Sequence, residues 1–393
     1  MTNLKKIYAL RYQKTLLFLS GLILFVYGYS SVDTMKDWQW RDHYYHSEEF
    51  INEFEESLDT RIRDYDEKGQ PIYYNNIKEF QDTQLTLFQH YPESSLYYTG
   101  AAIPSRSVYY PGKTYTSNSS YFVFLFPIVF LAGFALFFVD QKTNFNRLLF
   151  TLPVSRKRLF LDKLRYIALP FAGVLALGSF LQILFYTWGF PSEYVNASFF
   201  QMLYSGFSHW LLLILAFVLG LFLGVLLNHL ILAPTLIILG FFAFLLVSDF
   251  YRNFAWIINH YFPKVKFYDL DGIFVIWPGK TASPWWIILM LGCAIALFLF
   301  LSYVIFKHLS LENTGQLLSV PDFKLPVFIT LFLLTSIWFN LGLWDIGYRL
   351  SANLRLPYEE VALTILLCLS MSFGLIYYPE IYKKWQNIQK KIA

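Results

Sequence analysis

The sequence predicts an all-α polytopic membrane protein with about eight transmembrane helices and a small, mainly helical external domain between spans 1 and 2. The chain has 393 residues, of which 56% are hydrophobic, 21% aromatic and only 15% charged. Its mean hydropathy is +0.42. A bilayer core of roughly 30 Å needs about 20 mostly apolar residues per helix. Several windows meet that length with few or no charges, which excludes an ordinary soluble protein.

We expect eight spans, each an apolar window bounded by polar residues. They lie near residues 16–31, 121–139, 166–188, 207–228, 230–248, 285–306, 326–344 and 361–378. The chain then divides into segments with distinct expected locations. These are an amphipathic N-terminal cytoplasmic segment (1–14), transmembrane helix 1 (15–31), the external domain (32–120), transmembrane helices 2–8 (121–378) with a loop at 140–165, and a basic cytoplasmic tail (379–393).

The distribution of Lys and Arg predicts the orientation. The N-terminus, the loop at 140–165 and the C-terminal tail are all basic, and an eight-span topology places them on one side. Because short cytoplasmic loops carry an excess of Lys and Arg, we expect both termini in the cytoplasm. Residues 31–120 hold fifteen acidic and eight basic residues and fall outside. The net charge of +4 is therefore a sum of opposed halves, and no nucleic-acid partner is expected.

The first span has a second interpretation, because its apolar run is short. Gly28, Tyr29 and Ser30 offer small residues at cleavage-like spacing, as in a secretory signal peptide. In the external domain, Ser47 is a suitable N-cap for a helix with apolar residues at three- and four-residue spacing. These residues are Phe50, Ile51, Phe54, Leu58 and Ile62. A second helix is expected from about Asn76 to His90.

Several motifs resemble enzymatic or metal sites but lack residues that those sites require. The Pro-Gly-Lys stretches at Lys113 and Lys280 lack the first glycine of a phosphate-binding loop, so each is expected to be a turn. His43 and His46 lack further ligands for a metal. The pair Glu359-Glu360 is similar to the glutamate motif of intramembrane CAAX-type proteases but has Thr364 where that motif has Arg.

Cys293 and Cys368 lie within separate apolar helices and suggest neither a disulfide nor a metal site. We therefore expect no catalytic residue, cofactor or metal in this chain. Two other classes of function stay open: a membrane-embedded transferase or hydrolase, and a non-transporting peptide sensor or immunity protein. Gly220 and Gly224, four residues apart in an apolar window, indicate close helix packing in lipid.

The most informative segment is the loop at residues 140–165, DQKTNFNRLLFTLPVSRKRLFLDKLR. Phe145, Leu148, Leu149 and Leu152 have the spacing of one helical face, and Pro153 ends that helix. Ser155 can cap the next helix, whose first turn holds Arg156, Lys157 and Arg158. Cations there oppose the helix dipole at a cost of roughly 0.3–1 kcal/mol each. Contact with anionic lipid, worth about 1 kcal/mol per residue, offsets that cost.

This loop resembles the first cytoplasmic loop of ABC-2-type exporter permeases, the membrane subunits of ABC transporters. In that family an acidic residue follows the second span, and a short coupling helix precedes a Leu-Leu pair, a Pro-Val-Ser-Arg sequence and a Lys. Here these are Asp140, Leu148-Leu149, the stretch 153–156 and Lys163. The usual small residue that opens the coupling helix is absent, since Asn144 and Phe145 stand there. The large external insert also resembles that of sodium-exporter-like and peptide-exporter-like members. The segment SLENTGQLLSV from Ser310 is similar to a segment that follows the sixth span in eight-span members.

The resemblance implies a permease subunit of an ATP-driven exporter in a bacterial plasma membrane, acting on a peptide, lipid-like or other small substrate. ATP and Mg would bind to separate ATPase subunits, and the permease would pair with a second copy or a second permease subunit and contact membrane lipids. The residues expected to receive the ATPase are Phe145, Leu148, Leu149, Leu152 and Pro153. The residues expected to anchor the loop are Asp140, Arg147, Arg156, Arg158 and Lys163.

Overall fold

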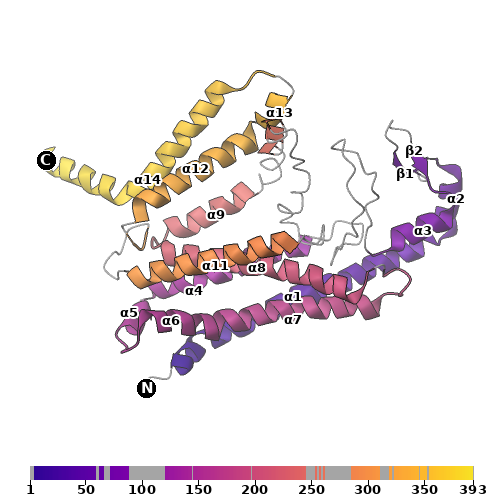
Figure 1. The fold of residues 1–393 in the computed structure, drawn as a ribbon, viewed down its shortest axis with the longest axis horizontal. Helices are drawn as coiled ribbons and strands as arrows, with labels where there is room; N and C mark the ends of the chain where they lie inside the picture. Colours follow the sequence, from indigo (N-terminus) through magenta and orange to yellow (C-terminus); the bar gives the residue numbers. More distant parts are fainter. Residues whose placement is uncertain are drawn as a thin grey trace. The chain divides into compact units, whose positions relative to one another are not determined.

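The computed structural model is predominantly helical (Figure 1). It describes residues 4–58, 62–65, 71–87, 120–143, 145–195, 197–244, 253–254, 256–257, 260–261, 285–309, 318–320, 323–344, 346–351 and 354–392. Within these residues, seven helices are long and apolar enough to cross a membrane. The protein is therefore an all-α polytopic membrane protein, as the sequence predicts.

Seven of the eight predicted spans contain such a helix. They are α1 (Leu4–Tyr45), α4 (Ser120–Lys142), the run α6 (Arg156–Lys163), η2 (Leu164–Ala168) and α7 (Leu169–Gly189), α8 (Phe199–Leu226), α11 (Trp285–His308), α12 (Lys324–Leu343) and α14 (Tyr358–Ile392). The predicted span 230–248 contains α9 (Leu232–Phe244), a helix of 13 residues. Residues 245–250 lie outside the described part of the chain.

The chain divides into two compact units. Residues 1–129, 162–216 and 272–294 form the first, and residues 130–161, 217–271 and 295–393 form the second. In the first unit α1 packs along α7. Tyr27 of α1 is buried, and a Cβ atom on Gly178 of α7 would lie only 2.3 Å from its ring. The glycine therefore leaves the space in which the tyrosine ring lies.

Helix α1 corrects the predicted division of the N-terminus. The sequence suggested an interfacial helix, a span and the start of a separate external domain, whereas residues 4–45 form one helix of 42 residues. No proline interrupts this stretch. At 1.5 Å per residue the helix is about 63 Å long, roughly twice the thickness of a bilayer core. It therefore extends well beyond the membrane.

Two short helices follow α1, and both begin at N-caps. Ser47 Oγ accepts a hydrogen bond from the Phe50 amide at the start of α2 (Glu48–Glu56), as predicted. Asn76 Oδ1 accepts from the Glu79 amide at the start of α3 (Ile77–Leu85). The predicted continuation of the first helix to Ile62 is wrong. Ile62 instead begins β1 (Ile62–Tyr65), which pairs in antiparallel fashion with β2 (Pro71–Tyr73).

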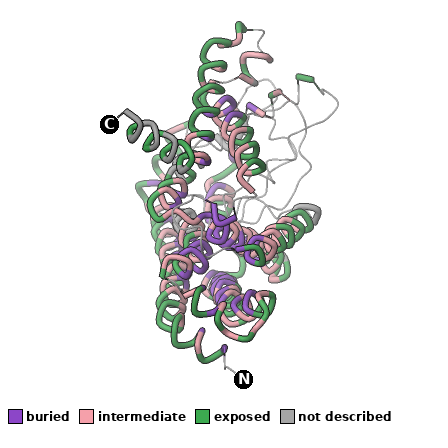
Figure 2. Tube along the Cα trace, turned by 90° about the vertical axis from the view of Figure 1, so that its left-hand side faces the viewer, coloured by how far each residue is buried: buried purple, intermediate pink, exposed green. Residues whose placement is uncertain are grey.

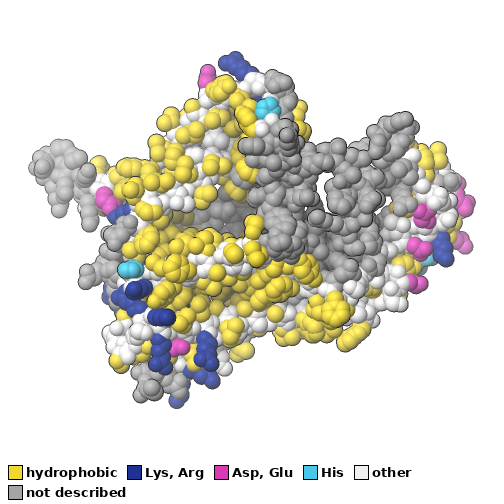
Figure 3. Space-filling model, viewed as in Figure 1, with side chains coloured by type: hydrophobic (Ala, Val, Ile, Leu, Met, Phe, Trp, Pro, Cys, Tyr) yellow, Lys and Arg dark blue, Asp and Glu magenta, His cyan; other side chains and the backbone are white. Residues whose placement is uncertain are grey.

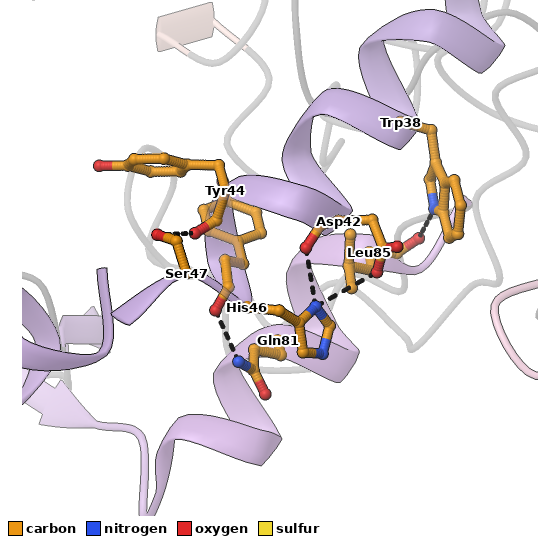
Figure 4. Close-up of polar contacts among 8 residues, drawn as sticks. Trp38, Asp42, Tyr44, His46, Ser47, Gln81 and Leu85 are labelled. Atoms are coloured by element: carbon orange, nitrogen blue, oxygen red, sulfur yellow. Dashed lines mark hydrogen bonds and ion pairs between the residues drawn. The ribbon is translucent and has the colours of Figure 1, made fainter. Parts of the chain in front are cut away.

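An aromatic core joins these elements to the end of α1. Its buried members are Phe50, Phe54, Tyr74 and Phe80. Figure 4 shows two polar contacts that fix α3: Gln81 Nε2 donates to the Tyr45 carbonyl at 2.6 Å, and Trp38 Nε1 donates to the Leu85 carbonyl at 2.8 Å. Trp38 belongs to a second core that also contains Ile183 and Tyr186 of α7.

In the second unit α12 and α14 pack as a pair (Figure 1). Lys324 forms an ion pair with Glu380 near one end. Near the other end, Trp344 Nε1 donates to Thr364 Oγ1 at 3.0 Å. Much of α14, which leads to the C-terminus, is exposed (Figure 2), as expected of a helix surrounded by lipid. It continues into the predicted basic tail as far as Ile392.

Replacing Trp38 by Phe tests the attachment of α3. The phenyl ring keeps the edge-to-face packing on Phe190, whose centroid lies 5.7 Å away, but the Leu85 carbonyl loses its donor. We expect a loss of about 0.5–1.5 kcal/mol of local stability. Hydrogen exchange should accelerate in α3 and stay unchanged in α12 and α14. Unchanged exchange in α3 would contradict this role.

Candidate functional site between α4 and α6

The helix predicted at residues 145–152 is present but shorter. Helix α5 runs from Phe145 to Phe150, and Leu152 and Pro153 lie in the turn that follows it. Thr151 Oγ1 donates to the Leu148 carbonyl at 2.8 Å, and the Leu152 amide donates to the Leu149 carbonyl at 3.3 Å. The early end agrees with the aversion of a residue before proline to helical dihedral angles.

The apolar residues that were predicted to form one exposed face of α5 differ in exposure. Leu149 is only 1% exposed and packs inside the protein, whereas Leu148 is 54% exposed. Phe145 and Leu152 are half-buried, and Pro153 is exposed. The prediction that all five residues form a docking surface therefore needs correction, because Leu149 is inaccessible to a partner in this arrangement. The accessible apolar group at the centre of α5 is Leu148.

Asn146 of α5 was not singled out from the sequence. Its side chain is 1% exposed, and within the described residues neither amide atom has a hydrogen-bond partner. An unpaired buried polar group costs about 1–3 kcal/mol. This arrangement of α5 therefore carries a local penalty that no apolar residue at the same position would carry.

An aromatic cluster attaches α5 and α6 to two long helices of the second unit. It consists of Phe137 of α4, Phe150 of α5, Phe160 of α6, and Tyr303 and Phe306 of α11. The Phe306 ring lies 5.5–5.6 Å from the rings of the three other phenylalanines. Rings at these spacings contribute about 0.5–1.5 kcal/mol per pair beyond their buried area. The loop is thus held by packing as well as by its covalent connections.

Arg156 connects the start of α6 to the end of α11. Its Nη1 atom donates to the carbonyls of Lys307 and Leu309 at 2.8 and 2.9 Å. Its guanidinium also lies 4.6 Å from the centre of the Phe150 ring. The carbonyls at a helix C-terminus lack donors in their own helix, and a cation there favours the helix dipole. Arg156 thus caps α11, and its predicted role in anchoring the loop to lipid or a partner stays a prediction.

Residues at the end of α4 bond to the end of α8 and to the turn that follows it. Lys142 Nζ donates to the backbone carbonyl and to Oδ1 of Asn228. Gln141 Nε2 donates to the carbonyls of Gly224 and Val225 at 3.2 and 3.1 Å. The Ser319 hydroxyl donates to the Val225 carbonyl at 2.7 Å. Ser319 belongs to the segment whose sequence suggested the eight-span form. Sequence analysis missed these contacts because the partners are more than 80 residues apart.

Three further cations of the loop are exposed. Ser155 Oγ accepts a weak hydrogen bond from the Arg158 amide at 3.4 Å, consistent with the predicted N-cap. Arg147, Lys157 and Arg158 are exposed, and residues 141–161 contain no Asp or Glu. Figure 3 shows Lys and Arg side chains gathered around α5 and α6, beside a mainly apolar surface on α11. The loop therefore exposes several cations together with the apolar side chain of Leu148.

The two other predicted anchors are internal. Asp140 at the end of α4 is fully buried, and Lys163 at the end of α6 is 1% exposed. Lys163 Nζ lies 5.6 Å from the centre of the Tyr12 ring of α1. Both charges therefore act within the protein and are inaccessible to a partner.

Gly220 and Gly224 lie where α8 crosses α4. A Cβ atom on Gly220 would come within 2.0 Å of the Phe130 carbonyl oxygen, and one on Gly224 within 2.3 Å of the Phe134 carbonyl oxygen. On α4 a Cβ atom on Gly133 would come within 2.0 Å of the Phe217 carbonyl oxygen. The glycines thus allow backbone-to-backbone packing inside the chain.

The other motifs do not gather into a site. His46 contacts Asp42, with Nδ1 2.7 Å from its carbonyl oxygen. In the part of the chain that the structure describes, no three His, Cys, Asp or Glu side chains lie together as metal ligands. Glu359 and Glu360 lie in the first turn of α14, where acidic residues favour the dipole. The Pro-Gly-Lys stretches at Lys113 and Lys280 lie outside the described residues.

Comparison with protein-family models, curated proteins and solved structures gave no match to this chain.

Replacing Gly220 by Ala tests the contact between α4 and α8. The added methyl group meets backbone atoms, which cannot rotate away, so we expect a loss of roughly 1–3 kcal/mol and a lower melting temperature in detergent. The control is Gly374→Ala in α14, where a Cβ atom has no neighbour within 4 Å. Equal melting temperatures for the two variants would refute the contact.

Replacing Asn146 by Leu should stabilise the protein. Leucine has the same number and branching of side-chain heavy atoms and removes an amide that is buried without a partner among the described residues, so we expect a gain of about 1–3 kcal/mol. Thermal unfolding of the purified protein measures this. A large loss of stability would mean that the amide is paired in the native protein.

Proposed function

We propose that this protein is the membrane-spanning permease subunit of an ATP-driven ABC exporter of the ABC-2 type. Separate ATPase subunits, which hold ATP and Mg, dock on the exposed face of α5 and the following turn. The chain lies in a bacterial plasma membrane with both termini in the cytoplasm, and it works as a homodimer or beside a second permease subunit. Catalysis takes place in the ATPase, not in this chain.

The observation that carries the proposal is the exposed face of the α4–α6 loop. Leu148 of α5 is 54% exposed, whereas Leu149 beside it is buried. The same loop also exposes the cations Arg147, Lys157 and Arg158. A loop that exposes an apolar residue together with cations suits a partner that offers an apolar pocket and acidic groups, because such charges steer association and suppress wrong partners.

The attachment of the loop supports the same function. A loop that only bound a partner could be flexible, whereas a loop that transmits a partner's movement must be fixed to the spans. The aromatic cluster packs α5 against α11, and Arg156 bonds to the end of that helix. The seven apolar helices supply the membrane-spanning body through which a substrate would pass. The substrate class is a peptide, a lipid-like molecule or another small compound.

A substitution at Leu148 tests the docking site. The tagged protein is purified from its native membrane and the ATP hydrolysis that accompanies it is measured. We expect Leu148→Asp to lower that activity at least about tenfold, since an unpaired charge buried at an interface costs about 2–5 kcal/mol. Leu148→Met keeps an apolar side chain of similar volume and should retain the activity.

A second exposed leucine provides a control for the added charge. Leu10 of α1 is 84% exposed, and Leu10→Asp should leave the accompanying ATP hydrolysis unchanged. Undiminished activity in Leu148→Asp would exclude docking at α5. If the wild-type protein carries no ATP hydrolysis, the proposed function fails as a whole.

A further inference from the structure

The segment between α4 and α6 is bracketed by two cations: Arg156 caps the C-terminus of α11, and Lys142 bonds to Asn228, two residues beyond the end of α8. Lys142 lies at its beginning and donates to Asn228. Arg156 lies at its end and donates to the last carbonyls of α11. Neither α8 nor α11 is adjacent to this segment in the sequence. The contacts therefore connect α5 to two helices that the chain itself does not connect to it.

Arg156 occupies a position that its own helix disfavours. It is the first residue of α6, where a positive charge opposes the helix dipole. Its guanidinium reaches instead the C-terminus of α11, where the same charge is favourable and where the carbonyls need donors. The local cost at α6 is thus offset by a contact with another helix, which indicates that the position serves the link to α11.

Phe150 strengthens this link. Its ring lies between the Arg156 guanidinium, 4.6 Å away, and the Phe306 ring, 5.6 Å away. The side chain of α5 that is nearest to the turn therefore contacts both the capping residue and the helix that is capped. A displacement of α5 would have to break these contacts or carry the end of α11 with it.

We propose that Arg156 is a positioning residue that couples the docking helix α5 to α11, so that the two move as one body, with Lys142 making the corresponding connection to α8. The inference rests on the proposed function only for the origin of the movement, which is the ATPase bound at Leu148. The connection itself is a property of this chain and can be measured without any partner.

Distance measurements between spin labels test the connection in the purified protein. Cys293 and Cys368 are replaced by Ala, and labels are attached to Thr151→Cys after α5 and His308→Cys at the end of α11, both exposed positions. We expect one narrow distance distribution, which is lost in Arg156→Gln and partly kept in Arg156→Lys. An ammonium can donate to the carbonyls but cannot stack on Phe150 as a planar guanidinium does.

Lys157→Gln is the matched control, because it removes the same charge from the neighbouring exposed position. It should leave the distribution narrow. If Arg156→Gln also leaves it narrow, the coupling role of Arg156 is refuted. If Arg156→Gln fails to fold, Arg156→Lys decides: a distribution identical to that of the unaltered protein also refutes the role.

The connection made by Lys142 is tested with spin labels at Thr143→Cys and Leu230→Cys. We expect one narrow distance distribution between them, which is lost in Lys142→Gln. An unchanged distribution there refutes its connection to α8.

A second measurement separates coupling from a merely structural role. In the complex with the ATPase, Arg156→Gln should leave ATPase binding unchanged, while substrate moved per ATP falls at least about fivefold, the lower end of usual coupling between two sites. Equal loss of binding and transport would overturn the coupling role. Failure of any ATPase to bind the unaltered protein would refute the proposed function, while the label distances would still decide the inference on Arg156.

Discussion

The free carbonyls at the C-terminal ends of α8 and α11 impose the constraint on which the cytoplasmic part of the proposed topology depends. The last carbonyls of a helix have no donor within their own helix and need one from elsewhere. Gln141 and Ser319 meet this need at α8, and Arg156 meets it at α11. The same bonds fix where α4 ends and where α6 begins, and so they set the position of α5 between them.

Close helix packing reinforces that arrangement. Gly133, Gly220 and Gly224 bring the backbones of α4 and α8 into contact, and the aromatic cluster fills the space around Phe306. In lipid such packing replaces the hydrophobic effect as the main source of association between helices. In the second unit, polar caps therefore satisfy the helix ends, and small residues allow the helices to pack closely along their length.

Much of the fold could be predicted from the sequence, because a membrane span needs only a long apolar window. Ser47 and Ser155 were also readable as N-caps, since the partner of an N-cap lies three residues away. The roles of Arg156 and Leu149 were not readable. Arg156 bonds to residues more than 150 positions further along the chain, and no local pattern reports such a partner. Leu149 and Leu148 share one helical stripe, but periodicity does not show which of them meets the rest of the protein.

The unbroken helix α1 has a consequence for how the chain can tolerate insertions. Tyr27 is buried near Gly178 of α7, and Trp38, eleven residues later, bonds to the end of α3. With 3.6 residues per turn, one inserted residue between them would rotate Trp38 by about 100° away from Leu85. An insertion of seven residues restores the angle but raises Trp38 by about 10 Å. The contacts of Tyr27 and Trp38 therefore fix both the rotation and the length of the part of α1 between them.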